Sequence, residues 1–103
     1  MPRAPASKPQ PLDPTLKREQ VRLVGQFGAA LRELRSDRLL SIERVAEAAG
    51  LHPNYLGSVE RGERNISLYN IWRVAAALDL PASALLEPLP QRKAKPAVPN
   101  VRP

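Results

Sequence analysis

The stretch that most constrains the fold is residues 41–67, SIERVAEAAGLHPNYLGSVERGERNIS. Apolar side chains recur at helical spacing over its first nine residues. Gly50-Leu51-His52 interrupts that pattern, and Pro53 follows, whose fixed φ and missing N–H suit the first position of a helix. The sequence therefore predicts two short helices, 41–49 and 53–61, joined by a three-residue turn that contains glycine.

The longer segment LLSIERVAEAAGLHPNYLGSVERGERNISLYNIWRVAAALDL resembles the lambda-repressor-like helix-turn-helix family, the Cro and xenobiotic-response-element (XRE) regulators of bacteria and phages. The spacing A-x-x-x-G-L-x-x-x-Y-L-x-x-V-E-R-G-x-R-x-x-S carries the resemblance, which extends from about Val24 to Leu86. Within the family, the chain is most similar to small single-domain controller proteins of restriction-modification systems. The resemblance implies an all-α fold, a compact five-helix DNA-binding domain with the helix-turn-helix at 41–61.

The remaining helices are predicted from spacing and capping residues. Asp13-Pro14 suits a helix start, and the apolar pattern continues to about Arg38. Gly25 and Gly28 each weaken this helix by roughly 1 kcal/mol relative to Ala. Two alternatives therefore stay open: one long helix from Pro14, or a frayed segment before a firm helix at Val24. Ser67 caps a fourth helix that reaches about Leu78, and a short fifth helix covers about 82–87.

Proline-rich tails flank this domain, which we place at residues 14–87. Residues 1–13 combine four prolines before Asp13 with small and polar residues. Residues 88–103, PLPQRKAKPAVPNVRP, are basic and again rich in proline. Because neither segment can bury enough apolar surface to offset its ordering entropy, we expect both tails to be disordered.

The net charge of +6 is carried by residues outside 22–87, most of them in the tails. From Arg22 to Glu87 there are eight arginines and eight acidic residues, so this part is formally neutral. Bulk basicity therefore does not indicate that the folded part binds nucleic acid. Flexible basic arms would add a salt-sensitive attraction to phosphate that does not depend on base sequence.

Composition excludes several other classes of protein. The chain has no cysteine, and the longest apolar run, Val74 to Leu78, is far too short to cross a bilayer. The N-terminus lacks the apolar segment of a signal peptide. We therefore expect a cytoplasmic, nucleoid-associated bacterial protein without membrane contact. With one histidine, no glycine-rich phosphate loop and no paired carboxylates, no enzymatic activity, metal or cofactor is expected.

The helix 53–61 carries the residues expected to read bases. Its apolar side chains fall on one side, and short, hydrogen-bonding residues fall on the other at helical spacing. A helix face made of short side chains can enter a major groove deeply. Asn54 offers a donor and acceptor pair for an adenine edge, Ser58 bonds to several bases, and Gly57 permits close approach. An ordinary tolerated glycine is the alternative interpretation of Gly57.

Residues around the motif are candidates for holding phosphates. Many relatives carry a glutamine that clamps phosphate where Ile42 stands here, so at this helix start the contact must come from backbone N–H groups or from Arg44. His52 is expected to cap the second helix, Tyr55 to be a half-buried ring, and each arginine has a solvated surface charge as its alternative. The phosphate candidates are Arg44, His52, Tyr55, Arg61, Arg64 and Asn65.

Glu60 is expected to hold the fold rather than to contact DNA. A carboxylate aimed at phosphate would be repelled, and the resemblance implies that this glutamate pairs with an arginine near the end of the first helix, here Arg35. Gly62 is expected to end the helix as a C′ glycine.

A dimer is the assembly that the resemblance implies, because a small domain gains specificity from two half-sites about 34 Å apart. Residues that would form a two-fold patch are Trp72, Leu80, Leu86 and Leu89. The alternative interpretation of Trp72 is a side chain that only covers the edge of the domain. The sequence thus favours a dimeric, sequence-specific transcriptional regulator of double-stranded DNA that alters access of RNA polymerase to a pseudo-palindromic operator. One alternative is an antitoxin-type or protein-binding adaptor with a cognate protein partner, its DNA contact being auxiliary. Another is tails that bind nucleic acid without sequence choice.

Overall fold

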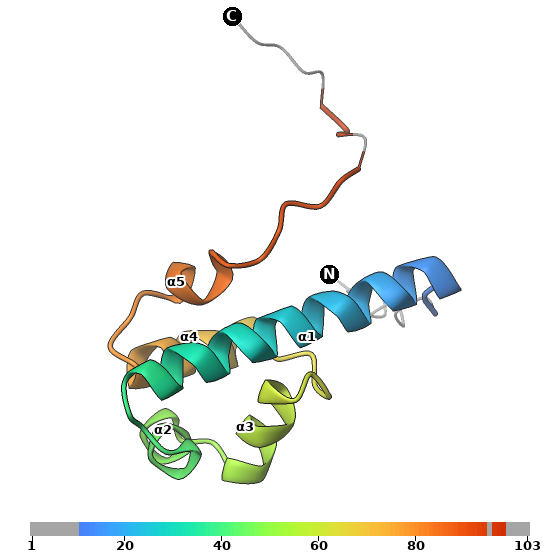
Figure 1. Cartoon of the computed structure of the whole chain (residues 1–103). Helices are drawn as coiled ribbons and strands as arrows, with labels where there is room; N and C mark the ends of the chain where they lie inside the picture. The colour runs from blue at the N-terminus through green and yellow to red at the C-terminus, as the bar shows by residue number, and fades with distance from the viewer. Residues whose placement is uncertain (1–10, 95, 99–103) are drawn as a thin grey trace, which may run out of the picture.

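The computed structural model describes residues 11–94 and 96–98, and this part of the chain contains helices and no strand (Figure 1). The all-α prediction with five helices is confirmed. Residues 1–10, 95 and 99–103 of the predicted tails lie outside the described residues. The helices are α1 (Pro14–Asp37), α2 (Ile42–Ala49), α3 (Pro53–Glu60), α4 (Leu68–Ala77) and α5 (Ala82–Leu86).

The first helix, α1, is one continuous helix of 24 residues from Pro14. Of the two alternatives for its start, the long helix is therefore the one observed. The side chain of Asp13 accepts a hydrogen bond from the backbone N–H of Leu16 at 2.9 Å, and proline occupies the first helical position. The helix ends near the predicted residue because Leu39 adopts a positive φ of 56°, which a helix cannot continue.

The caps of the next three helices follow the sequence signals. Ser41 Oγ accepts from the N–H of the third residue along at 3.1 Å, and Ser67 does the same for α4. His52 Nδ1 accepts from the N–H of Asn54 at 3.0 Å, which confirms its predicted capping role. Gly50 and Gly62 end α2 and α3 in the left-handed region, with φ of 71° and 77°.

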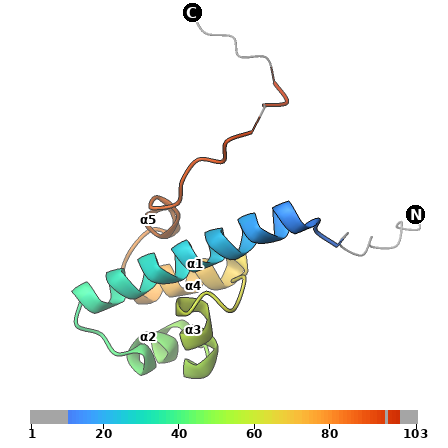
Figure 2. The same cartoon turned by 45° about the vertical axis from the view of Figure 1, so that its right-hand side comes forward.

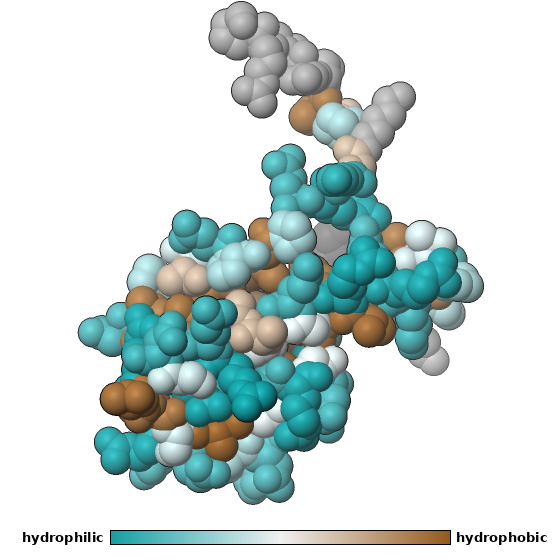
Figure 3. Space-filling model, in the orientation of Figure 1, coloured by the Kyte–Doolittle hydropathy of each residue, from teal (hydrophilic) through white to brown (hydrophobic). Residues whose placement is uncertain are grey.

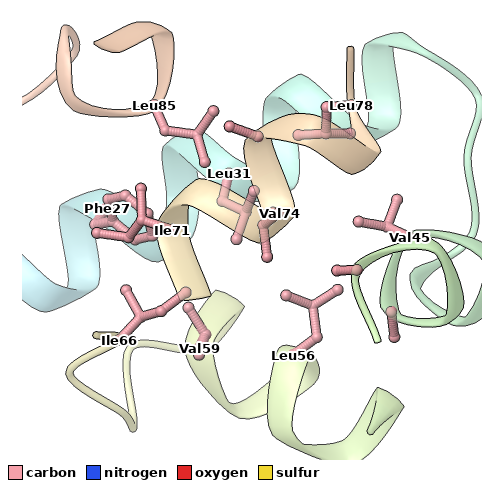
Figure 4. Close-up of a cluster of buried hydrophobic side chains, with 13 residues drawn as sticks. Phe27, Leu31, Val45, Leu56, Val59, Ile66, Ile71, Val74, Leu78 and Leu85 are labelled. Carbon is pink, nitrogen blue, oxygen red and sulfur yellow. The ribbon is translucent and has the colours of Figure 1, made fainter. Parts of the chain in front are cut away.

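Every helix contributes to one apolar core, drawn in Figure 4. α1 packs against α3 and α5, α2 packs against α3 and α4, and α4 packs against α5. In Figures 1 and 2, α2 and α3 lie on one side of α1 and α5 lies on the other. The largest fully buried side chains are Leu31, Val45, Leu56, Val59, Val74 and Leu85.

Gly28 of α1 and Gly62 of the loop after α3 permit close contact between these parts of the chain. A Cβ on Gly28 would collide with the carbonyl oxygen of Val59 and lie 2.6 Å from that of Glu60. A Cβ on Gly62 would lie 2.9 Å from the Cα of Gly25. The chain after α3 therefore crosses α1 at Gly25, and the part of α1 before that residue projects past the loop (Figures 1 and 2).

Candidate nucleic-acid interface

The turn between α2 and α3 is fixed by a polar side chain of α4. Arg73 donates to the carbonyl oxygen of Gly50 at 2.7 Å and to Asn70 Oδ1 at 3.2 Å. The amide of Asn70 donates in turn to the hydroxyl of Tyr55 on α3 at 3.2 Å. Arg73 also lies over the ring of Tyr69, 5.1 Å from its centroid. This network ties the turn and the start of α3 to one rigid helix.

Asn70 and Arg73 are not among the residues that the sequence pattern predicts for the interface. A signal was present, because these two residues are three apart in an otherwise apolar or aromatic helix and therefore share a face. Their partners, Gly50 and Tyr55, are more than a dozen residues away in the chain. Spacing alone could not identify those partners.

Asn54 is the polar residue that α3 presents most openly. Its side chain is exposed one residue after the start of the helix. The backbone N–H of Asn54 donates to His52, but its side-chain amide forms no hydrogen bond within the described part of the chain. His52 beside it is exposed as well, although its Nδ1 atom is occupied by the cap. The end of α3 near the turn thus offers an amide donor and acceptor that are free to pair with another molecule.

Gly57 and Ser58 are buried, contrary to the exposed face that helical spacing predicts. Ser58 is only 8% exposed, and its hydroxyl donates to the carbonyl oxygen of Tyr55 at 2.6 Å. A Cβ on Gly57 would lie 3.2 Å from the guanidinium of Arg61 and 3.5 Å from the δ-methyl of Ile42. A helix this short, covered by α2 and by its own arginine, keeps a narrower open face than its sequence pattern indicates.

The cationic phosphate candidates differ in their partners. Arg61 is exposed, but its guanidinium pairs with Glu63 at 3.1 Å, and the pair raises the pKa of Arg61 and lowers that of Glu63. Arg44 and Arg64 are exposed, and within the described part of the chain neither forms a salt bridge. Asn65 is exposed next to Arg64. Arg44 and Arg64 are therefore the arginines ready to meet an anion without losing an existing pair.

The half-buried Tyr55 has the environment predicted for it, and its hydroxyl oxygen already accepts from Asn70. Its O–H hydrogen remains available as a donor.

The Arg35–Glu60 pair implied by the resemblance is present and joins α1 to the end of α3. Arg35 Nε and Nη2 donate to the two carboxylate oxygens of Glu60 at 2.7 and 2.9 Å, and Nη1 donates to the carbonyl oxygen of Leu40 at 2.8 Å. The Glu60 side chain is only 5% exposed. Its hydrogen bonds hold the pKa of Arg35 above the ordinary value. Glu60 thus ties the end of α3 to α1, and its carboxylate is turned toward Arg35 rather than toward solvent.

The four residues expected in a dimer patch do not all meet. Leu86 and Leu89 line one shallow cavity of about 170 Å³ together with Leu23 and Ile71. Trp72 is 64% exposed and instead stacks on Tyr69, with ring centroids 6.3 Å apart. Leu80 is half-buried against the core.

The described part of the chain offers neither a membrane-spanning helix nor a cluster of metal ligands. Within residues 11–94 and 96–98, no helix is long and apolar enough to cross a membrane. Over the same residues, no three histidine, cysteine or acidic side chains gather as metal ligands would.

Comparison with known proteins identifies the class. The family described as Helix-turn-helix matches residues 31–85, and the chain belongs to this family of XRE-type, DNA-binding transcriptional regulators, which is not an enzyme family. The match spans the end of α1, all of α2, α3 and α4, and α5 up to Leu85, and it leaves out the projecting half of α1.

Several individual proteins are similar to it. Control protein C.SmaI of Serratia marcescens is 45% identical over 56 residues, which are 54% of this chain and 67% of that protein. The HTH-type transcriptional regulator SutR of Escherichia coli is 38% identical over 62 residues, 60% of this chain, and the chain spans only 35% of its length.

Solved structures agree with this assignment. The restriction-modification controller protein C.AhdI of Aeromonas hydrophila superposes with a TM-score of 0.59 at 48% identity, covering 60% of this chain and 94% of that one. The hypothetical transcription factor NHTF of Neisseria has a TM-score of 0.59 at 33% identity, covering 80% of this chain and 84% of that one.

Proposed function

We propose that the protein is a dimeric, sequence-specific transcriptional regulator that places α3 in the major groove at each half of a pseudo-palindromic operator. The observation that supports this most is the exposed, unengaged amide of Asn54 at the start of a helix whose other sides are held by the core. A rigid helix with a free amide at its open end can present that group to a base edge without losing an internal hydrogen bond.

Within this proposal, the residues divide into base-reading and positioning roles. Asn54 pairs in a bidentate manner with an adenine. Arg64 and Asn65 after α3, and Arg44 in the first turn of α2, contact the sugar-phosphate backbone and fix the register. Arg61 joins them only after its guanidinium leaves Glu63. The buried Ser58 contributes less to base reading than Asn54 does. Gly57 contributes because it has no side chain, so the DNA can approach the backbone of α3 closely.

Dimerisation couples binding to the concentration of the protein itself. Two domains reading half-sites about 34 Å apart gain specificity that one domain lacks. Of the four residues predicted for such an interface, Trp72 and Leu86 are the more open, at 64% and 40% exposed. Because the chain has a single tryptophan, its fluorescence on dilution measures the dimer dissociation constant directly. A constant far below any cellular concentration would remove this mode of regulation.

Substitution of Asn54 tests the base-reading role. Genomic fragments selected by the wild-type protein and trimmed by footprinting provide the operator. We expect Asn54→Ala to cost about 1 to 3 kcal/mol on that operator and to relax base choice at one position, measured by competition with every single-base variant. Equal losses on operator and random duplex would show that Asn54 does not read sequence.

Arg64→Ala is the matched comparison, because Arg64 is equally exposed but assigned to phosphate. We expect it to weaken binding to all sequences alike and to reduce the slope of log K against log salt by about 1. A change in base preference instead would move Arg64 to the base-reading group.

A protein-binding adaptor is the second candidate function. It is favoured by the exposed, stacked pair Tyr69–Trp72 on α4, because aromatic side chains of this kind are enriched at protein interfaces. Chemical-shift mapping with the selected duplex separates the two functions. Perturbations centred on Asn54 support the regulator, and a spectrum unchanged at α3 supports the adaptor.

A further inference from the structure

The projecting half of α1 and the segment after α5 carry the positive charge of the molecule. The family-matched residues 31–85 hold seven arginines and seven acidic residues, so their formal charge is zero. All six units of net charge therefore lie outside that region. Five of the basic residues there are described by the structure: Lys17, Arg18, Arg22, Arg92 and Lys93.

Three of these basic residues share an open groove, and Lys17 and Arg18 are exposed on the same projecting half of α1. An open groove of about 670 Å³ runs between the projecting half of α1 and the segment after α5, and Arg22, Arg92 and Lys93 line it. Arg92 is held there by Glu19, whose carboxylate oxygens accept from Arg92 Nε at 3.0 and 3.1 Å. Asp13, the other acidic residue of this half of α1, caps the helix. Within the described part of the chain, Lys17, Arg18, Arg22 and Lys93 form no salt bridge.

The groove also reaches the loop after α3. Asn65, one of the phosphate candidates of the recognition unit, lines the same groove. In Figures 1 and 2 the projecting half of α1 continues past that loop, and in Figure 3 the surface over it is mainly hydrophilic. The groove therefore meets the loop after α3 at Asn65, although most of it lies on the α5 side of α1.

We propose that Lys17, Arg18 and Arg22, with Lys93, form a second contact with the phosphates of duplex DNA that flanks the base-read half-site. This inference rests on the proposed function and extends it. The twelve residues from Pro14 to Gly25 span about 16 Å of helix, and DNA carries one negative charge for about every 1.7 Å of its axis. Arg18 and Arg22 lie four residues apart on one face, so both can follow one phosphate strand.

The contact is independent of sequence and sensitive to duplex length. It reads no base, because its cations reach only the backbone. An operator trimmed to the two half-sites lacks the flanking phosphates that this surface would contact. An operator with ten extra base pairs at each end supplies those phosphates. The full-length protein is expected to bind the flanked duplex on the order of tenfold more tightly at about 0.1 M salt, and with a steeper salt slope.

The test compares these two duplexes with the wild type and two double variants. Arg18→Gln with Arg22→Gln removes the proposed contact and keeps a good helix-forming residue at both positions. Arg32→Gln with Arg38→Gln removes the same charge from exposed positions at the other end of the same helix. We expect the first variant to lose the length dependence and the second to keep it. Circular dichroism and sedimentation establish that both variants remain helical and keep the assembly state of the wild type.

Other outcomes overturn the proposal. Equal wild-type affinity for both duplexes, or an unchanged length dependence in Arg18→Gln/Arg22→Gln, shows that this surface makes no flanking contact. Loss of affinity for a duplex RNA competitor, with DNA binding unchanged, assigns the surface to RNA. Asn54→Ala keeps this test separate from the proposed function, because it is expected to weaken both duplexes in parallel. If no operator can be selected but the wild type still prefers longer duplexes of any sequence, the proposal of a flanking phosphate contact stands and the proposal of a sequence-specific regulator fails.

Discussion

The two halves of α1 are held in place by different forces, although they form one continuous helix. In the half from Val24 to Asp37, Phe27 and Leu31 are buried and Arg35 pairs with Glu60. In the half from Pro14 to Leu23, no residue is buried, and the side-chain hydrogen bonds are a capping bond at Asp13 and a surface ion pair. The first of these halves is fixed by tertiary packing, and the second by local signals.

This difference determines what each half can do. The projecting half extends a helix that the packed half has already nucleated, so its residues gain only the small free energy of helix propagation and its free end frays readily. The packed half therefore sets the orientation of α3, for which rigidity is required. The projecting half can fray or adjust, which suits a contact to a phosphate backbone that carries no sequence information.

Gly28 and Gly25 give the largest expected contrast within the packed half. A Cβ on Gly28 would lie 2.6 Å from the carbonyl oxygen of Glu60, a backbone atom that cannot rotate away, whereas nothing lies within 4 Å of a Cβ on Gly25. We expect Gly28→Ala to lower the free energy of unfolding by more than about 3 kcal/mol. Gly25→Ala is expected to raise it by about 0.5 to 1 kcal/mol through helix propensity.

Urea unfolding followed by circular dichroism measures both changes. The two substitutions add the same methyl group to the same helix, three residues apart. Opposite signs of the change in unfolding free energy would therefore reflect the different surroundings of the two positions. Similar small effects at both positions would mean that α1 and α3 separate easily, and the contrast between packed and projecting halves would lose its structural basis.

The ion pair between α1 and α3 is expected to give the next largest effect. Glu60→Gln leaves the guanidinium of Arg35 half-buried without its charged partner, which we expect to cost about 2 to 3 kcal/mol of unfolding free energy. The pKa of Arg35 is raised, so its charge persists throughout the working pH range. Stability from this arginine would be lost only as pH rises above the ordinary arginine range, so substitution is the practical test.

The exposed pair of the projecting half is the control for that prediction. Glu19→Gln removes the partner of Arg92, but both side chains are exposed, at 46% and 60%. Exposed pairs of this kind contribute little, and we expect no measurable change in the urea midpoint. A loss as large as that of Glu60→Gln would show that the segment after α5 supports the fold.

Much of the fold follows from local sequence signals. The capping residues Ser41, His52 and Ser67 and the turn glycines Gly50 and Gly62 act on groups within a few residues of themselves. Helix bounds were therefore predictable to within a residue or so. The start of α1 was left open because glycines weaken its centre, and neighbouring residues do not reveal that Gly28 is compensated by close contact with α3.

The candidate site was predictable only in part, because exposure is a property of the packed molecule. Asn54 is open as expected, while Ser58 and Gly57 are buried by neighbours that helical periodicity does not describe. The bond from Arg73 to Gly50 joins residues 23 apart in the chain, and no spacing rule identifies such a partner. Spacing along a helix predicted which polar residues could contact DNA, and tertiary packing determined which of them are exposed to solvent.

The smallest expected effect distinguishes local from global stability. Asp13→Ala removes the hydrogen bond that the Asp13 side chain accepts from the N–H of Leu16, a cap typically worth about 1 kcal/mol. Because the projecting half opens without disturbing the core, we expect faster amide hydrogen exchange in the first turns of α1 and an unchanged urea midpoint. Ser41→Ala removes the matching cap from α2, a packed helix, and is expected to shift the midpoint. If Asp13→Ala shifts it equally, α1 unfolds as one unit, and the projecting half is as much part of the cooperative fold as the half that orients α3.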